Sequence, residues 1–137
     1  MAERLFNELN RLAEPLTSPA DTFLFRRDAS STSVYLLQKG SIALLWPDAE
    51  DIDPMEVLGP GSIIGLPAAL NGAYSVSAKS VIDSELGVVS AVRVVELLEC
   101  NPDLCRVAMR LMGQEVGRMR SLITRYSGRI EKVSRPH

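Results

Sequence analysis

Histidine is the residue that most limits what chemistry this sequence can carry. It occurs once in 137 residues, as the last residue, His137. Without an internal histidine the chain cannot assemble a Ser–His–Asp triad, a Cys–His pair or a histidine-based zinc site. The two cysteines, Cys100 and Cys105, are too few for a disulfide framework or an iron–sulfur cluster. We therefore expect no metal centre and no nucleophilic enzyme.

Two further motifs could carry catalysis, and neither fits. The paired carboxylates of Asp48 to Asp53 lie in a polar stretch. Acid–base catalysis needs two carboxyl groups with different pKa values, and only an apolar environment around one of them would produce that difference. The glycines of Gly59 to Gly65 leave three residues where the dinucleotide fingerprint needs two, and no βαβ pattern surrounds them. A cupin-like metal enzyme is the alternative from another class, and the missing histidine ligands count against it. The sequence favours a protein that is not an enzyme.

The segment Gly61 to Ser80, GSIIGLPAALNGAYSVSAKS, could bind a ligand. It combines a tight glycine turn, a one-turn helix over Leu66 to Leu70, an Asn71–Gly72 turn and a strand rich in serine. Free N–H groups at the start of a short helix, facing hydroxyls, favour an anion or another polar ligand.

This segment lies in a β-rich central region of the sequence, with predicted helices at the N-terminal and C-terminal ends of the chain. Apolar residues at helical spacing predict a helix over Ala2 to Ala13, and Pro15 ends it. Between residues 20 and 90, short apolar runs alternate with turn signals such as Lys39–Gly40, which favours a barrel or jelly roll. The expected strands cover residues 22–25, 34–38, 41–46, 55–58, 75–78, 81–82 and 85–90.

The C-terminal third changes to a helical period. A short helix is expected over Ala91 to Glu99, and a long helix that Asn101 caps runs to Gly128. Residues spaced alternately by four and three form a heptad seam, which is typical of paired helices. Its members are Cys105, Met109, Met112, Val116, Met119, Ile123 and Tyr126. We expect a homodimer through this seam; the alternative is one wide apolar face buried in the chain's own domain.

Length and charge suggest one domain over residues 1–137. It consists of an N-terminal helix and linker (1–19), a β-roll (20–90), C-terminal helices (91–127) and a basic tail (128–137).

The charges are distributed unevenly along the chain. Residues 1–105 carry 15 acidic and 7 basic side chains, whereas residues 106–137 carry 2 acidic and 8 basic side chains. A basic tail alone offers only phosphate contacts, so we expect no specific DNA binding. No run is apolar enough for a membrane span and no signal peptide is recognisable, so the cytoplasm is the expected compartment.

From about Thr22 to Leu122, the chain resembles the cyclic-nucleotide-binding domain of the Crp–Fnr (catabolite activator) superfamily. TFLFRRDASSTSVYLLQKGSIALL is similar to the family's opening strands, with Tyr35 and Gly40 on its usual aromatic residue and glycine. VLGPGSIIG resembles its glycine-rich turn, ALNG the end of its short helix, and ECNPDL the start of its dimerising helix. The resemblance implies a mainly β fold with flanking helices, an eight-stranded β-roll (jelly roll) with a long C-terminal dimerisation helix. The family's DNA-binding winged helix does not fit into Arg129 to His137.

The resemblance also implies where a nucleotide would bind. The family's phosphate-binding cassette reads roughly Gly-Glu-x-Ala-Leu, followed by Arg-Ser or Arg-Ala before the next strand. Here Gly65 is kept, Leu66 takes the position of the glutamate and Tyr74 that of the arginine. The remaining candidate pocket residues are Pro67, Ala68, Ser75, Ser77 and, from a gap-free count along the long helix, Met119 and Arg120.

Losing both charged groups removes two charge-assisted hydrogen bonds, each worth about 1.5–3 kcal/mol, which is roughly two to four decades of affinity. We therefore expect a dimeric regulatory or sensory module with a degenerate pocket and no cofactor, which acts by binding another ligand or a partner protein. Replacing Leu66 by glutamate and Tyr74 by arginine together should then restore binding. The alternative is a genuine cAMP or cGMP receptor that uses Ser75, Ser77 and the backbone N–H groups of residues 65–67.

Overall fold

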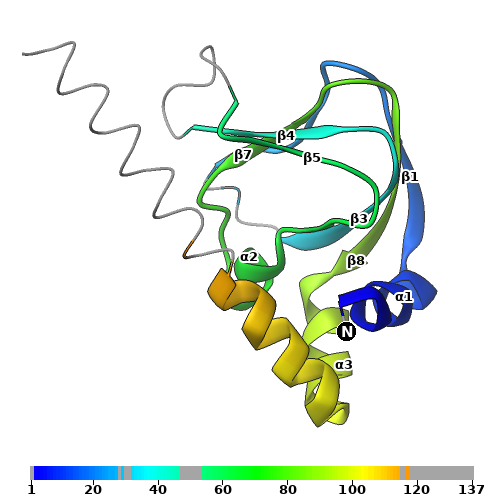
Figure 1. Cartoon of the computed structure of the whole chain (residues 1–137), viewed down its shortest axis with the longest axis vertical. Helices are drawn as coiled ribbons and strands as arrows, with labels where there is room; N and C mark the ends of the chain where they lie inside the picture. The colour runs from blue at the N-terminus through cyan, green and yellow to red at the C-terminus, as the bar shows by residue number, and fades with distance from the viewer. Residues whose placement is uncertain (1, 28, 30–31, 47–53, 115–116, 118–137) are drawn as a thin grey trace, which may run out of the picture.

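The computed structural model describes residues 2–27, 29, 32–46, 54–114 and 117. Eight strands in this part of the chain form two antiparallel four-stranded sheets, and the helices gather at one end of them (Figure 1). The first sheet has the order β1 (Glu14–Ser18), β8 (Ser84–Ser90), β3 (Ser33–Lys39) and β6 (Ile63–Ile64). The second has the order β2 (Phe23–Phe25), β7 (Ser77–Ser80), β4 (Ile42–Leu45) and β5 (Glu56–Leu58). The expected β-roll with flanking helices is confirmed.

The strands differ from the sequence expectation in four places: β1 and β6 were not expected, β7 begins at Ser77 instead of Ser75, and residues 81–82 are not a strand. Residues 14–18 were expected in a linker, but they form β1, which pairs with β8 along its whole length. Pro15 is compatible with this position because β1 is an edge strand, where a missing N–H breaks no ladder. Residues 81–82, expected as a strand, instead form the bend between β7 and β8.

The N-terminal helix α1 (Ala2–Leu12) packs on the first sheet through the apolar stripe seen in the sequence. Leu5 and Leu9 are fully buried. The end of the helix lies so close to β8 that a Cβ atom added at Gly87 would come within 2.7 Å of the Cβ atom of Ala13. The Gln38 side chain also donates a hydrogen bond of 2.8 Å to Asn10. These contacts fix α1 against the roll.

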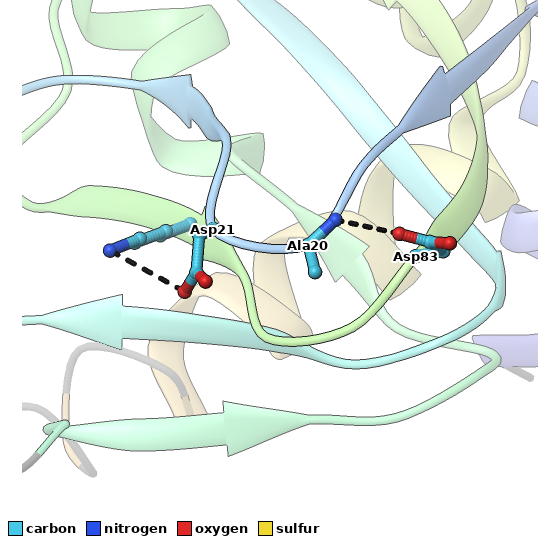
Figure 2. A network of polar contacts seen from close by, with 4 residues as sticks. Ala20, Asp21 and Asp83 are labelled. Carbon is cyan, nitrogen blue, oxygen red and sulfur yellow. Dashed lines mark hydrogen bonds and ion pairs between the residues drawn. The ribbon is translucent and has the colours of Figure 1, made fainter.

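The turns at the opposite end of the roll are tied together by polar contacts. Asp83 accepts a hydrogen bond of 2.9 Å from the backbone N–H of Ala20, and Asp21 lies 3.8 Å from the ammonium group of Lys79 (Figure 2). At the ends of β1 and β7, the buried hydroxyls of Ser18 and Ser80 are 2.6 Å apart. The β1–β2 and β7–β8 turns therefore hold each other, far from the helices.

The apolar residues form two clusters on opposite faces of the first sheet. Along β3, Val34 and Leu36 belong to one cluster and Leu37 to the other, because alternate residues of a strand point to opposite faces. The helix-side cluster consists of Leu5, Leu9, Val34, Leu36, Leu66, Ala69, Val89, Val94, Leu98, Leu104, Val107 and Ala108. The roll-interior cluster consists of Phe25, Leu37, Ile42, Leu44, Trp46, Met55, Ile64, Ala68, Tyr74, Val76, Ala78 and Leu86.

Helix α3 (Ala91–Cys100) and a C-terminal helix (residues 102–114) complete the helical layer. Asn101 differs from its expected role. Its side-chain amide donates to the carbonyl oxygen of Leu97 at 2.8 Å, so its side chain closes the end of α3, whereas its backbone carbonyl accepts from Cys105. The expected continuation of the long helix to residue 127 lies outside the described residues, apart from residue 117, which is helical.

The described residues contain neither a membrane-spanning helix nor a cluster of metal ligands. None of the helices in this part of the chain has both the length and the apolar composition needed to cross a membrane. Among the same residues, no three histidine, cysteine or acidic side chains are grouped so that they could hold a metal ion.

Candidate functional site

The segment that follows β6 is shaped by two glycines. Gly65 has φ +89°, a left-handed conformation that glycine adopts without steric cost, and it turns the chain from β6 into the short helix α2 (Leu66–Asn71). Pro67 lies in the first turn of α2, where its missing N–H leaves no helical bond unmade. Gly72, with φ +85°, ends the helix and donates its N–H to the carbonyl oxygen of Ala68 at 2.8 Å.

Tyr74, at the position of the family's arginine, points into the roll. Its side chain is only 3% exposed and stacks on Phe25, with ring centroids 3.7 Å apart and the planes inclined by 11°. Phe25 in turn stacks on Tyr35, with centroids 5.8 Å apart. Three aromatic rings thus occupy this part of the interior.

The hydroxyl of Tyr74 satisfies both backbone polar groups of Ser33. It donates to the Ser33 carbonyl oxygen and accepts from the Ser33 N–H, and both distances are 2.8 Å. Tyr35 pairs with Ile64, so continuing the same register would place Leu66 opposite Ser33. The chain has already left the sheet at Gly65, and the hydroxyl replaces the missing strand.

Gly65 is part of the same arrangement. A Cβ atom added there would lie 3.0 Å from the carbonyl oxygen of Ser33 and 3.1 Å from Cε1 of Tyr74. A side chain at residue 65 would therefore press on both partners of the hydrogen-bonded pair.

Both tyrosines are held in their neutral form. Burial, together with the neighbouring Tyr74, raises the pKa of Tyr35 to about 12. Burial also raises the pKa of Tyr74, although its hydrogen bonds to Ser33 and Tyr35 act in the opposite direction. At neutral pH these rings present phenols, which bring no positive charge to a phosphate.

Of the other predicted pocket residues, Ala68 lies in the same cluster as Tyr74, whereas Leu66 lies in the other cluster. Ala68 packs in the roll-interior cluster beside Tyr74, and Ser75 is exposed. Leu66 is 2% exposed and belongs to the helix-side cluster, next to a cavity of about 210 Å³ that Ala2, Leu111 and Gln114 also line. Ser77 is buried, and its hydroxyl accepts from the backbone N–H of Arg27 at 2.9 Å. Met119 and Arg120 lie outside the described residues.

Sequence reasoning did not identify Phe25 and Ser33 as part of this site. Phe25 lies 49 positions before Tyr74 and Ser33 lies 41 before it, so only the fold brings them together. The single available signal was the aromatic Tyr74 at a position that the resemblance assigned to a charged residue.

A second feature lies on the outer side of α2. An apolar groove of about 170 Å³ runs between α2, α3 and the C-terminal helix. Met109, which is 62% exposed, and Met112 line it, and both belong to the predicted heptad seam. The other lining residues are Leu70, Val95, Leu98, Glu99, Cys105 and Ala108.

Two solved structures with a similar fold are a catabolite activator protein and a global regulator. The catabolite activator protein of Thermus thermophilus is 18% identical, with a TM-score of 0.74 over 90% of this chain. The c-di-GMP-responsive global regulator CLP of Xanthomonas campestris is 19% identical, with a TM-score of 0.72 over 90% of this chain. The chain covers 59% and 62% of these two proteins, respectively.

A third similar structure comes from work on a cyclic-GMP-dependent signalling pathway that regulates bacterial phytopathogenesis. It is 26% identical, with a TM-score of 0.68, and the match covers 82% of this chain and 89% of that one. No curated protein sequence matches the chain. The profile of the cyclic nucleotide-binding domain family matches residues 15–101, which is more than half of the chain. The chain therefore belongs to the cyclic nucleotide-binding domain family, and it shares the fold of the catabolite activator proteins.

Proposed function

We propose that this protein is a non-catalytic regulatory module whose roll does not take cAMP or cGMP, and that it works as a homodimer. In this proposal its signal is another ligand or a partner protein. The fold and family supply the regulatory framework, and the two particular claims, about the pocket and about the dimer, rest on separate observations.

The observation that carries the first claim is the position of Tyr74. Its ring is buried on Phe25, and its hydroxyl is engaged twice by Ser33. A nucleotide phosphate at this position would have to displace the ring and break both hydrogen bonds to Ser33. As an acceptor it could rebind only the N–H, so the carbonyl oxygen would be left unpaired, which costs about 1–3 kcal/mol. The phosphate would gain no bond to a guanidinium in return, because the residue at the arginine position is a neutral phenol.

The residue at the glutamate position supports the same conclusion. Leu66 packs among Leu5, Leu9 and other helix-side residues instead of facing Tyr74. A ribose hydroxyl in the roll would thus meet no carboxylate from this position. Burying such a hydroxyl without a partner is unfavourable.

The dimer claim rests on the groove beside the C-terminal helix. Met109 is an exposed large apolar residue, and it lines the groove together with Met112. The occupant that fits is the C-terminal helix of a second copy, because each copy carries the same heptad seam. Burial of the two methionines between the copies would remove them from water.

Two observations favour the alternative of a true cyclic-nucleotide receptor. Ser75 keeps the hydroxyl of the family's cassette, and it is exposed to solvent. The 26% identical structure comes from a pathway that depends on cyclic GMP. For this chain to bind in the same pocket, Tyr74 would have to move out of the roll.

Native mass spectrometry of the purified protein tests both claims together. We expect a species with twice the mass of the chain and without a bound nucleotide, because the seam pairs two copies and Tyr74 fills the roll. A monomer at roughly ten micromolar, within the affinity range of modest interfaces, would contradict the dimer. A mass increment of one cyclic nucleotide per chain would contradict the filled pocket.

A further inference from the structure

We propose that Tyr74 is an internal latch, which holds the α2 segment (residues 65–74) against β3 in the place of a bound ligand and thereby sets the shape of the apolar groove. The latch itself depends only on the contacts inside the roll. Its effect on the groove rests on the proposed homodimer.

The α2 segment depends on tertiary contacts for its conformation. Helix α2 has six residues, and an isolated helix of that length is not stable in water. Both its ends are glycines in the left-handed conformation, Gly65 and Gly72. Glycine permits large changes in φ and ψ, so these two positions can act as hinges.

Tyr74 fastens the C-terminal end of this segment to the sheet. The same hydroxyl donates to the carbonyl oxygen and accepts from the N–H of Ser33, while the ring rests on Phe25. Ser33 belongs to β3, the strand that pairs with both β6 and β8. One side chain thus connects a short helix between two glycines to a central strand of the first sheet.

Helix α2 transmits its position to both clusters and to the groove. Ala68 packs in the roll interior, whereas Leu66 and Ala69 pack in the helix-side cluster. Leu70, which is 47% exposed, lines the groove together with Met109 and Met112. Because packed side chains move as a unit, a shift of α2 changes the surface that the second copy would contact.

The test is hydrogen exchange of Tyr74→Phe, which keeps the ring and removes only the hydroxyl. We expect exchange at Ser33 and across residues 65–74 to become about 5- to 150-fold faster, the range that corresponds to leaving a buried polar group unpaired. Exchange in β4 and β7 should stay unchanged. We also expect the dimer to dissociate several-fold more readily, as is typical of coupling between sites.

Ser84→Ala is the matched control. The buried Ser84 hydroxyl also donates to one carbonyl oxygen, that of Ile82, and accepts from one N–H, that of Ser41. It lies at the opposite end of the roll, beside the β7–β8 turn. Its removal should speed exchange near Ser41 and leave residues 65–74 and the dimer unaffected.

A second pair of variants perturbs the latch without touching Tyr74. Gly65→Ala and Gly72→Ala introduce the same left-handed strain, at φ +89° and +85°, but only the Cβ atom at residue 65 meets Ser33 and Tyr74. Gly65→Ala should therefore speed exchange at Ser33 far more than Gly72→Ala. Equal effects of the two would overturn the latch.

The remaining outcomes separate the two proposals. If Tyr74→Phe leaves exchange unchanged, or speeds it by one factor throughout the roll, Tyr74 is an ordinary core residue and the latch is wrong. If exchange rises locally but the dimer affinity is unchanged, the coupling to the groove is wrong. A monomeric wild-type protein would overturn the proposed dimer, and with it the coupling, while the local exchange result would still decide the latch.

Discussion

Leu66→Glu is expected to destabilise the fold by about 2–5 kcal/mol, the range for losing a buried leucine or leaving a buried charge unpaired. Leu66 is 2% exposed among apolar residues from α1, β3 and the C-terminal helix. A carboxylate there would lose its hydration. The sequence alone suggested that this change, together with Tyr74→Arg, would restore a nucleotide site. With Leu66 placed in the helix-side cluster, we now expect loss of stability instead.

Urea unfolding measures this effect, with Leu66→Met as the control because a swap of similar volume costs less than about 1.5 kcal/mol. The loss in Leu66→Glu should shrink as the pH falls toward the ordinary glutamate pKa of about 4.3, since burial raises the pKa of the new carboxyl and favours its neutral form. A variant as stable as Leu66→Met would mean that residue 66 faces solvent or the pocket.

Met109→Lys is expected to weaken the homodimer by about 100-fold or more, because each copy would bring an unpaired ammonium group into the apolar seam. The side chain is 62% exposed in the single chain, so the change should leave the fold of each copy intact. Sedimentation velocity across a concentration series measures the dissociation constant, and circular dichroism checks the fold.

Val57→Lys is the matched control for this experiment. Val57 is 55% exposed and lies on β5, in the second sheet and away from the groove. The Val57→Lys variant should dimerise like the wild type. Equal dimerisation by Met109→Lys and the wild type would place the interface elsewhere.

The architecture could be anticipated because its signals are local. Short apolar runs between turn residues marked most strands, and the stripe of Leu5 and Leu9 marked the buried face of α1. Strand β1 was missed because Pro15 was taken as the end of a helix, whereas pairing with β8, some 70 residues later, determines the structure there. Strand β6 has only two residues, too few to show a period of two.

The site was harder to predict than the fold. The sequence identified Gly65, Ala68 and Tyr74 as a group, and the structure brings them together. It could not show that Leu66 turns toward the helices. Helix α2 has two buried faces, and a sequence pattern does not say which face meets the roll interior and which meets the helical layer. The sequence could not show the bond between Tyr74 and Ser33 either, since this bond depends on where β6 stops pairing with β3.

Calorimetric titration of the unmodified protein with cAMP and with cGMP tests the central claim most directly. The claim is that Tyr74 and Phe25 already fill the part of the roll that a nucleotide phosphate would enter. We expect no binding heat up to submillimolar ligand, a limit set by the roughly two to four decades of affinity lost with the two charged groups. Saturable binding at micromolar cAMP or cGMP would contradict the account and establish the protein as a genuine cyclic-nucleotide receptor.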